Sequence, residues 1–567
     1  MSQQTAELLY PSVPNISDIL DNIESREDQI VTRLAPSPTG FLHIWSVYTG
    51  LLNSNIAHQK DGIFMLRIED TDQARNTTDY QNKTWWVYSI LDGFKYFGLE
   101  VDEGVMYRSQ REIAQSWGYG PYIQSERLDI YKIFIKYLIT QDLAYPCFLT
   151  SDQLEQIRES QIISKSPTWV YGEYAISRNL TYEEIIEYID QGKDFSVRLK
   201  SPGSLGKRIG FDDEVKGHIE IDDNYEDVVL MKSDGFPTYH FAHIVDDYMM
   251  GVTHVIRTDE RLPSVPKHIQ IYSAFVDVFT RPIRKYAHPG PLMKIDQGNK
   301  RKLSKRKDPE ADVEMWIKDG IPPNATKVYL MGLMDSGYEP RWFEHFVENK
   351  NSDLDIVSYD RELSKINGTW AMVDMQKLAH ICSEYIASVW LDKLIMELES
   401  YMKMYPNSYI FEDNRKIDKD YLIDILSFDR QKKIHTNYND IIKYILPFAD
   451  DYFDEMGMDK SLLSGIDSKI IADFLSDYRD YISSTLFDWN IIAKTKEERF
   501  EDLKTIWKDH WFATNNAEFK EGGYIWKVGD LAMILRVLLY GSTNTPDIYE
   551  MIKVMWKDRV LKRLNIK

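Results

Sequence analysis

The chain has 567 residues, a formal net charge of −21 and 43% hydrophobic residues, which together predict a globular protein of several domains. Its two cysteines, Cys147 and Cys382, exclude a disulfide framework and indicate a reducing compartment. The sequence has no run of about 18 apolar residues that would predict a membrane span, and the acidic first 28 residues lack the pattern of a secretion signal. We therefore expect a cytoplasmic protein with no membrane contact.

A possible phosphate site comes first in the chain, in residues 32–46 (TRLAPSPTGFLHIWS). Residues 29–34 predict a strand, Pro36, Pro38 and Gly40 predict a rigid turn, and residues 44–60 predict a helix. His43 then lies at a helix N-terminus, where unpaired N–H groups and the helix dipole favour phosphate.

Further strands are expected along the next 200 residues. Residues 63–68 (IFMLRI) predict a buried strand that ends in Glu69, and residues 78–100 predict a helix. Residues 195–203 and 227–233 predict two more strands, and Asp234-Gly235 predicts a hairpin turn into residues 236–246. Residues 251–262 (GVTHVIRTDERL) predict a strand that ends at Arg257, and residues 322–333 predict a helix. From about residue 380 the pattern is helical throughout.

A basic cluster occupies residues 299–307 (NKRKLSKRK). Its lysines could neutralise the diphosphate that leaves during an adenylation reaction. The chain has no GxxxxGK[ST] loop, which disfavours an ATPase of the P-loop type.

The pair of motifs PSPTGFLHI and KLSKR resembles the two signature motifs of class I aminoacyl-tRNA synthetases, and RIEDTD resembles the glutamyl branch of that family. The resemblance implies an α/β fold: a split Rossmann-like catalytic domain with an inserted acceptor-binding domain, followed by an all-α anticodon-binding domain. The implied boundaries are an N-terminal extension (1–28), the two catalytic halves (29–115 and 226–290), the insertion (116–225), a KLSKR and stem-contact region (291–380) and the anticodon domain (381–567). Segment 395–490 is longer and more acidic than the family usually shows.

The resemblance also implies roles for individual residues. The catalytic residues would be His43, Lys302 and Lys305. ATP would meet Pro38, Gly40, His43, Trp45, Ser46, Lys302, Ser304 and Lys305. Glutamate would meet Arg33, Ala35, Ser37, Glu69, Tyr239, His243 and Arg257, although several relatives have Asn at position 243. Candidate tRNA contacts are Arg306, Lys307, Arg536 and Arg559.

The implied activity is that of a glutamate–tRNA ligase, which activates glutamate with ATP and Mg²⁺ and transfers it to the 3′ end of tRNA-Glu. Arginine–carboxylate pairing would select glutamate over glutamine. A monomer is the family expectation. Two alternatives stay open: a glutaminyl-type synthetase, and a catalytically silent tRNA- or protein-binding module. Many relatives bind zinc near Cys147, but this chain has Leu149 in place of the second cysteine, so we expect no metal ligands here.

One departure from the family concerns tryptophan. The nucleotide motif has glycine where this chain has Trp45, and an indole there should block ATP. Six other tryptophans also replace an expected glycine: Trp117, Trp169, Trp370, Trp511, Trp526 and Trp556. Glycine is scarce, at 28 residues against roughly 40 expected at about 7% usage. Two hypotheses are open: the gene reads UGA as glycine and was translated with UGA as tryptophan, or the lineage has lost activity.

Overall fold

The structure is a computed structural model. It describes residues 2–23, 26, 29–38, 40–72, 80–109, 112–116, 118–282, 284–304, 306–349, 362–404, 419–429, 433–450, 453, 468–483, 495, 497–498, 501, 504, 512–513, 515–524, 526–543 and 545–564. The chain divides into two compact units, one of residues 1–317 and 323–375 and one of residues 318–322 and 376–567.

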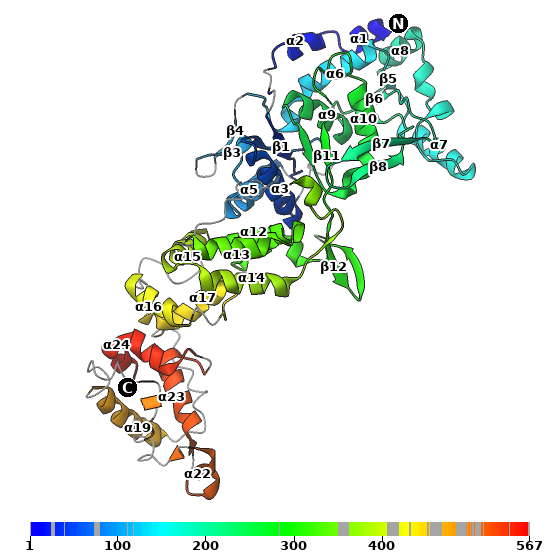
Figure 1. The fold of residues 1–567 in the computed structure, drawn as a ribbon. Coiled ribbons are helices and arrows are strands. Elements are labelled where there is room, and N and C mark those ends of the chain that lie inside the picture. Colours follow the sequence, from blue (N-terminus) through cyan, green and yellow to red (C-terminus); the bar gives the residue numbers. More distant parts are fainter. Residues whose placement is uncertain are drawn as a thin grey trace. The chain divides into compact units, whose positions relative to one another are not determined.

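A parallel sheet forms the centre of the first unit (Figure 1). Strands β1 (Val31–Leu34), β2 (Ile63–Leu66) and β3 (Glu103–Ser109) are parallel, and β4 (Glu112–Gln115) adds an antiparallel edge. On the other side of β1 lies β10 (His254–Ile256), where Thr253 N donates to Val31 O (2.9 Å), and β10 pairs in parallel with β11 (Lys285–Ala287). The spatial order β3-β2-β1-β10-β11 reverses between β1 and β10. Open α/β sheets bind ligands at such a switch point.

Two helices cover this sheet and place the first motif. Helix α3 (Ile44–His58) packs on β1 and β2, and its residues 47–57 are buried. Helix α5 (Tyr80–Tyr96) follows β2. The predicted strand and helix of the first motif are therefore confirmed, with the helix ending two residues earlier than expected.

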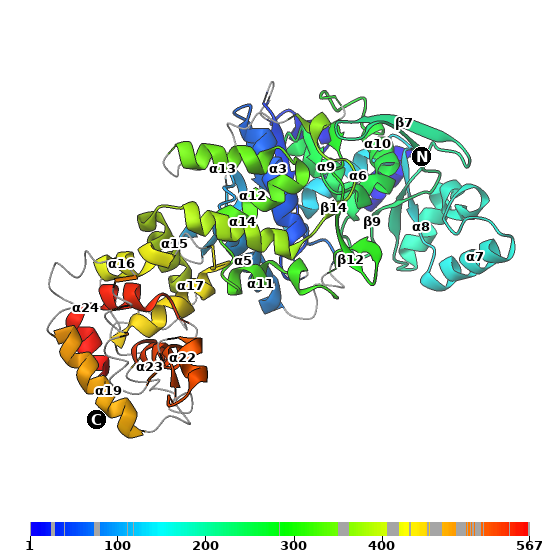
Figure 2. The ribbon, with the colours of Figure 1, turned by 60° about the horizontal axis from the view of Figure 1, so that its bottom comes forward.

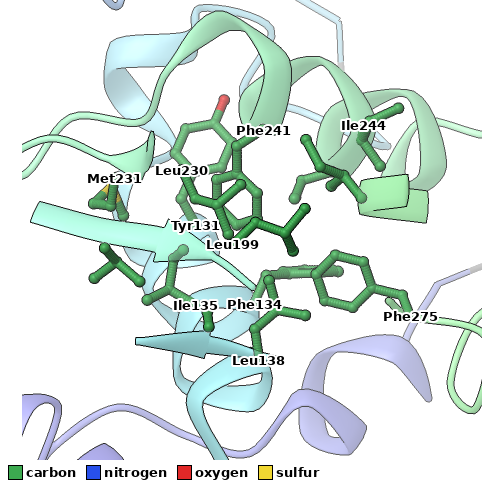
Figure 3. Close-up of a cluster of buried hydrophobic side chains, with 14 of the residues drawn as sticks. Tyr131, Phe134, Ile135, Leu138, Leu199, Leu230, Met231, Phe241, Ile244 and Phe275 are labelled. Atoms are coloured by element: carbon green, nitrogen blue, oxygen red, sulfur yellow. The ribbon is translucent and has the colours of Figure 1, made fainter. Parts of the chain in front are cut away.

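A second layer contains a cluster of buried apolar side chains (Figure 3). Helices α6 (Leu128–Thr140) and α9 (Tyr239–Met249) pack together with the sheet β5-β6-β9 in this cluster. It contains Tyr131, Phe134 and Leu138 of α6 and Phe241 and Ile244 of α9. The remaining elements are β5 (Ala144–Cys147), α7 (Ser151–Ile163), α8 (Tyr182–Asp190), β6 (Ser196–Leu199), β7 (Arg208–Asp213), β8 (Gly217–Asp222), β9 (Val229–Met231) and α10 (Val265–Ser273). The β7–β8 hairpin joins the central sheet through β11.

The hairpin expected around Asp234-Gly235 is wrong beyond its turn. The antiparallel pairing is limited to the bridge between Met231 and Pro237 and the flanking backbone bonds Lys232 N to Phe236 O and Thr238 N to Leu230 O (both 2.8 Å) among the described residues, and helix α9 begins at Tyr239. Phe241, Ile244, Val245 and neighbouring residues repeat at helical spacing and bury one face against the core. The turn itself is present, but the residues after it form a helix and not a second strand.

The N-terminal segment packs on this core. Helix α1 (Ser2–Leu9) lies against α6, where Lys136 Nζ bonds Glu7 Oε1 (2.9 Å) and Val13 O (2.8 Å). Ala6 is fully buried, and Ile16 of α2 (Ile16–Leu20) belongs to the same cluster.

The first unit ends with the basic hairpin and three helices. Strands β12 (Leu292–Asp296) and β13 (Asn299–Lys302) are antiparallel, and β14 (Ala371–Met372) pairs with β12. The helices are α11 (Val313–Lys318), α12 (Pro323–Met334) and α13 (Tyr338–Glu348).

The second unit is mostly helical (Figure 2). Its helices are α14 (Met375–Ser388), α15 (Leu391–Met404), α16 (Lys419–Asp429), α17 (Tyr438–Ile445), α19 (Ser468–Tyr481), α22 (Asn516–Glu521), α23 (Val528–Tyr540) and α24 (Ile548–Leu564). The expected all-α character needs one correction, because β15 (Phe512–Ala513) and β16 (Trp526–Lys527) form a two-stranded parallel pair. None of the described helices combines the length and apolar character that crossing a bilayer requires.

Candidate active site

A cavity of about 200 Å³ opens at the switch point, where β1 and β10 end. Six of the seven residues expected to bind glutamate line it, and Ser37 does not. The lining includes Arg33, Ala35, Glu69, Tyr239, His243 and Arg257, together with Trp45, Ser46, Thr49 and Arg261. Three guanidinium groups and one carboxylate suit a ligand with one ammonium group and two carboxylates.

A buried ion network holds Arg33 and Glu69 in place. Arg67 is fully buried and donates to Asp247 Oδ1 (2.7 Å) and Glu69 Oε1 (3.1 Å), while Arg33 Nε donates to Asp247 Oδ1 (3.3 Å). Burial opposes ionisation of Asp247, but Arg33, Arg67 and Arg284 outweigh it and lower its pKa to about 2. Arg67 and Asp247 are not among the residues expected from the sequence. A charged residue inside the apolar run IFMLRI was the available signal.

Burial raises the pKa of Glu69, and the attraction of Arg67 and Arg33 opposes that rise without cancelling it. A carboxyl group with a raised pKa gains a proton at a higher pH than usual. A bound ammonium group would restore the charged form, because opposite charges in a buried site attract strongly.

We therefore expect the KM for glutamate to rise as the pH falls through the raised pKa of Glu69. Above that pKa the carboxylate pairs with the substrate ammonium group, and below it the pairing is lost. KM measured from about pH 5 to 8 in a chain with glycine at position 45 tests this. Glu69→Gln should give a high KM without this acid dependence, whereas Glu112→Gln, on an exposed edge, should behave as the parent. A parent KM that stays flat with pH would contradict the expectation.

Neutral imidazoles surround Arg257 at the end of β10. Arg257 Nε donates to His288 Nε2 (3.2 Å), and Arg257 Nη1 lies 3.1 Å from the Tyr239 hydroxyl, which accepts, and 3.3 Å from His268 Nδ1. Burial, then nearby arginines, lower the pKa of His243 far below its ordinary value, and burial likewise lowers that of His268. The rings therefore stay neutral and accept from the guanidinium group instead of repelling it.

His288 links Arg257 to strand β7. Its Nδ1 lies 2.6 Å from Asp213 Oδ2, and both side chains are fully buried. Asp213 also accepts from the backbone N–H groups of Val215 and Lys216, which fixes it in the turn of the β7–β8 hairpin. The pair thus sets the ring orientation that presents Nε2 to Arg257.

In a chain with glycine at position 45, removing His288 should raise the KM for glutamate. His288→Ala leaves Arg257 Nε without its buried acceptor, which costs about 1–3 kcal/mol, or roughly 5- to 150-fold in KM. His288→Gln offers an amide oxygen and should recover part of the loss, while kcat changes less than KM. His218, whose side chain is 62% exposed in a similar pair with Asp212, provides the control as His218→Ala. Equal losses in both alanine variants would refute this role.

The nucleotide motif folds as predicted around His43. His43 caps α3, and its Nδ1 accepts from Trp45 N (3.0 Å). Of the residues expected to meet ATP, Trp45 and Ser46 line the cavity, whereas Pro38, Gly40, His43, Lys302 and Ser304 do not. The buried Trp45 indole nitrogen has no hydrogen-bond partner among the described residues.

The segment that follows the basic motif lies against the first motif. Asp312 forms a β-bridge with His43, and Val313 N donates to Leu42 O (3.1 Å). Lys302 Nζ pairs with Glu260 Oε1 (2.9 Å) in the loop after Arg257. Lys305 lies outside the described residues.

Two bonds from Arg301 to Asp308 (2.6 and 2.7 Å) shape the loop of the basic motif. Arg301 holds the pKa of Asp308 far below its usual range. Ser304 N also donates to Asp308 Oδ2 (2.9 Å). The loop therefore has a fixed turn between β13 and the residues that reach His43.

The four candidate tRNA residues differ in their surroundings. Arg306 and Lys307 are exposed, and Arg536 is half-buried on α23. Arg559 lies over the Tyr421 ring (4.0 Å) and within 3.5 Å of Asp450 Oδ2. Its role as a tRNA contact stays a prediction, as do the domain boundaries.

Cys147 is buried, at 2% exposure. Within the described ranges, no three His, Cys, Asp or Glu side chains cluster in a way that could hold a metal ion.

A doubly wound sheet with an arginine-rich cavity at its switch point, beside a capped helix N-terminus, defines an α/β enzyme of the nucleotide-binding class. Residues 29–376 match the family described as "tRNA synthetases class I (E and Q), catalytic domain", and residues 491–567 match "Anticodon binding domain". The chain belongs to this family of class I tRNA synthetases, and its full-length relatives place it among the glutamate–tRNA ligases.

The relatives extend over nearly the whole chain. A glutamate–tRNA ligase of Acetivibrio thermocellus is 32% identical over 575 residues and covers 99% of each chain, and one of Clostridium beijerinckii is 35% identical over 554 residues, covering 95% of this chain and 94% of its own. The crystal structure of the glutamate–tRNA synthetase from Elizabethkingia anophelis matches with a TM-score of 0.66 at 25% identity, covering 95% of this chain and 99% of its own.

Proposed function

We propose that the chain is a glutamate–tRNA ligase that activates glutamate with ATP and transfers it to the 3′ end of tRNA-Glu. The observation that carries the proposal is the cavity at the switch point, which Arg33, Glu69 and Arg257 line. Family membership over nearly the whole chain supports the same activity. It disfavours the silent binding module.

In this proposal Glu69 binds the substrate ammonium group, and Arg257 binds its side-chain carboxylate. Arg257 lies next to Tyr239 and Arg261, whose guanidinium carbon is 4.8 Å from the Tyr239 ring centre. A guanidinium group favours a carboxylate over an amide, so this arrangement favours glutamate over the glutamine of the glutaminyl-type alternative.

The first step joins glutamate to AMP. An oxygen of the α-carboxylate forms a bond to the α-phosphorus of ATP, the bond to the β-phosphate oxygen breaks, and diphosphate leaves. Negative charge on the oxygens of the α-phosphate would be stabilised by His43 and the N–H groups at the start of α3. The leaving diphosphate would be bound by Lys302, Ser304 and Lys305. Lys302 would exchange its exposed partner Glu260 for phosphate, at small cost because exposed ion pairs contribute little. When bound, Mg²⁺ would add charge neutralisation on the phosphates.

In the second step the 2′-hydroxyl of the terminal tRNA ribose attacks the carbonyl carbon of the adenylate, and AMP leaves. The candidate contacts to tRNA are Arg306 and Lys307 in the first unit and Arg536 and Arg559 in the second unit. We place the protein in the cytoplasm as a monomer.

ATP–diphosphate exchange and tRNA charging test the function. A chain with glycine at position 45 should catalyse exchange with glutamate, more strongly with tRNA present, and should charge tRNA-Glu. Exchange with glutamine alone would favour the glutaminyl-type enzyme. Binding of tRNA without any exchange would favour the silent module.

A further inference from the structure

The tryptophans of this chain fall into groups with different surroundings. Trp316 is fully buried and its indole nitrogen donates to Glu310 O (2.9 Å). Trp342 is 3% exposed and stacks on Phe346, with ring centres 4.4 Å apart. Both have the burial and contacts that a large aromatic residue usually has.

Other indoles are less buried, although lysine side chains lie over two of them, Lys267 over Trp169 (5.5 Å) and Lys300 over Trp370 (4.8 Å). Trp169 and Trp370 are each 50% exposed, and Trp556 is 61% exposed. The Trp526 indole nitrogen is buried with no hydrogen-bond partner among the described residues, as is that of Trp45. Exposure alone does not separate the groups, since Trp85 and Trp390 are also about half exposed.

The backbone at Trp556 is decisive. It has φ 59° and ψ 161° in the middle of α24, where the helix is kinked. This conformation lies at the edge of a region that is essentially restricted to glycine, because a Cβ collides there with the backbone. The other non-glycine residues with positive φ in the described ranges are Asp, Lys and Gln, none of them aromatic.

The cavity gives a second, independent sign. With Trp45 as one wall its volume is about 200 Å³, below the roughly 300–1,000 Å³ of typical ligand sites. Trp45 lies in the first turn of α3, two residues after His43, and the centres of the two rings are 5.5 Å apart. An indole therefore fills space at the helix terminus that would receive a nucleotide.

We propose that the natural protein carries glycine at positions 45, 169, 370, 526 and 556, because its gene reads UGA as glycine and the printed sequence translates UGA as tryptophan. Positions 117 and 511, outside the described residues, belong to the same set by the motif pattern. One change in decoding accounts for the positive φ at position 556, for the indole in the cavity wall at position 45 and for the two indole nitrogens without a partner among the described residues. It also accounts for the shortage of glycine. The consequence at position 45 rests on the proposed function, whereas the backbone at position 556 does not.

Reading the codons of the 14 tryptophans tests the proposal directly. UGA is expected at the seven positions, and UGG at 316 and 342. Peptide mass spectrometry of the protein from its natural source should find glycine at 45 and 556. UGG codons at these two positions, or tryptophan in their peptides, would overturn the proposal, and neither result depends on enzymatic activity.

A stability measurement tests the backbone strain at position 556 independently of the codons. In the chain as printed, Trp556→Gly should raise the melting temperature by a few degrees, because the strained residue is replaced by one that adopts this φ freely. Lys553, exposed on the same helix, is the matched control: Lys553→Gly should lower the melting temperature, as glycine does at an ordinary helical position. A fall in both variants would count against glycine at 556.

Discussion

Trp45→Gly is expected to convert an inactive chain into an active one in ATP–diphosphate exchange with glutamate. Forcing a large side chain into a filled site costs about 1–3 kcal/mol or more, which corresponds to at least roughly 5- to 150-fold in nucleotide affinity. An indole that cannot move aside would abolish binding altogether. Equilibrium binding of a non-hydrolysable ATP analogue, and exchange with tRNA present, measure the gain.

Trp85→Gly is the matched control for this experiment. Trp85 lies on α5 near the same motif, with its ring centre 5.5 Å from that of Phe41, but it does not line the cavity. Its removal should not restore exchange. If the printed chain already binds nucleotide as tightly as Trp45→Gly does, then the indole does not obstruct the site.

Arg257→Ala is expected to remove most of the preference for glutamate over glutamine. Loss of one partner from a buried charge pair costs about 3–5 kcal/mol, or roughly 10²- to 10⁴-fold in kcat/KM for glutamate. The value for glutamine should change much less, because a neutral amide gains little from the guanidinium charge. Exchange rates with each amino acid, measured in a chain with glycine at position 45, give the ratio.

Two variants make this result interpretable. Arg257→Lys keeps the charge but not the bidentate geometry, so it should lie between the parent and Arg257→Ala. Arg158→Ala, at an exposed pair on α7, should leave both amino acids unchanged. Equal losses for glutamate and glutamine in Arg257→Ala would show that Arg257 supports the fold and does not select the substrate.

Much of the site can be predicted from local pattern. Arg33, Glu69 and Arg257 each follow or end a short apolar strand, and parallel strands that end at one edge bring such residues together. His43 was placed correctly because a proline- and glycine-rich turn before a helical period determines where the helix begins. The relation between His43 and the basic motif, some 260 residues apart, came from resemblance to a family and not from spacing.

The failures have physical causes as well. The hairpin turn expected at Asp234-Gly235 is present, but it leads into a helix and not a long second strand, because turn residues specify only the turn and Phe241 and Ile244 are buried at helical spacing. Arg67 was overlooked because its charge is tolerated in a buried strand only through Asp247, which is 180 residues away.

The amino-acid sequence alone was enough to predict most strands and helices around the two motifs, because these depend on neighbours in the chain, and its motifs indicated the family by resemblance. Only the folded structure showed four further features of the site and the chain. These are the raised pKa of Glu69, the neutrality of His243, the support of Arg257 by His288 and Asp213, and the positive φ at Trp556. Each of these depends on the sum of burial, charge and backbone constraint from distant segments, and such sums do not exist until the chain is packed.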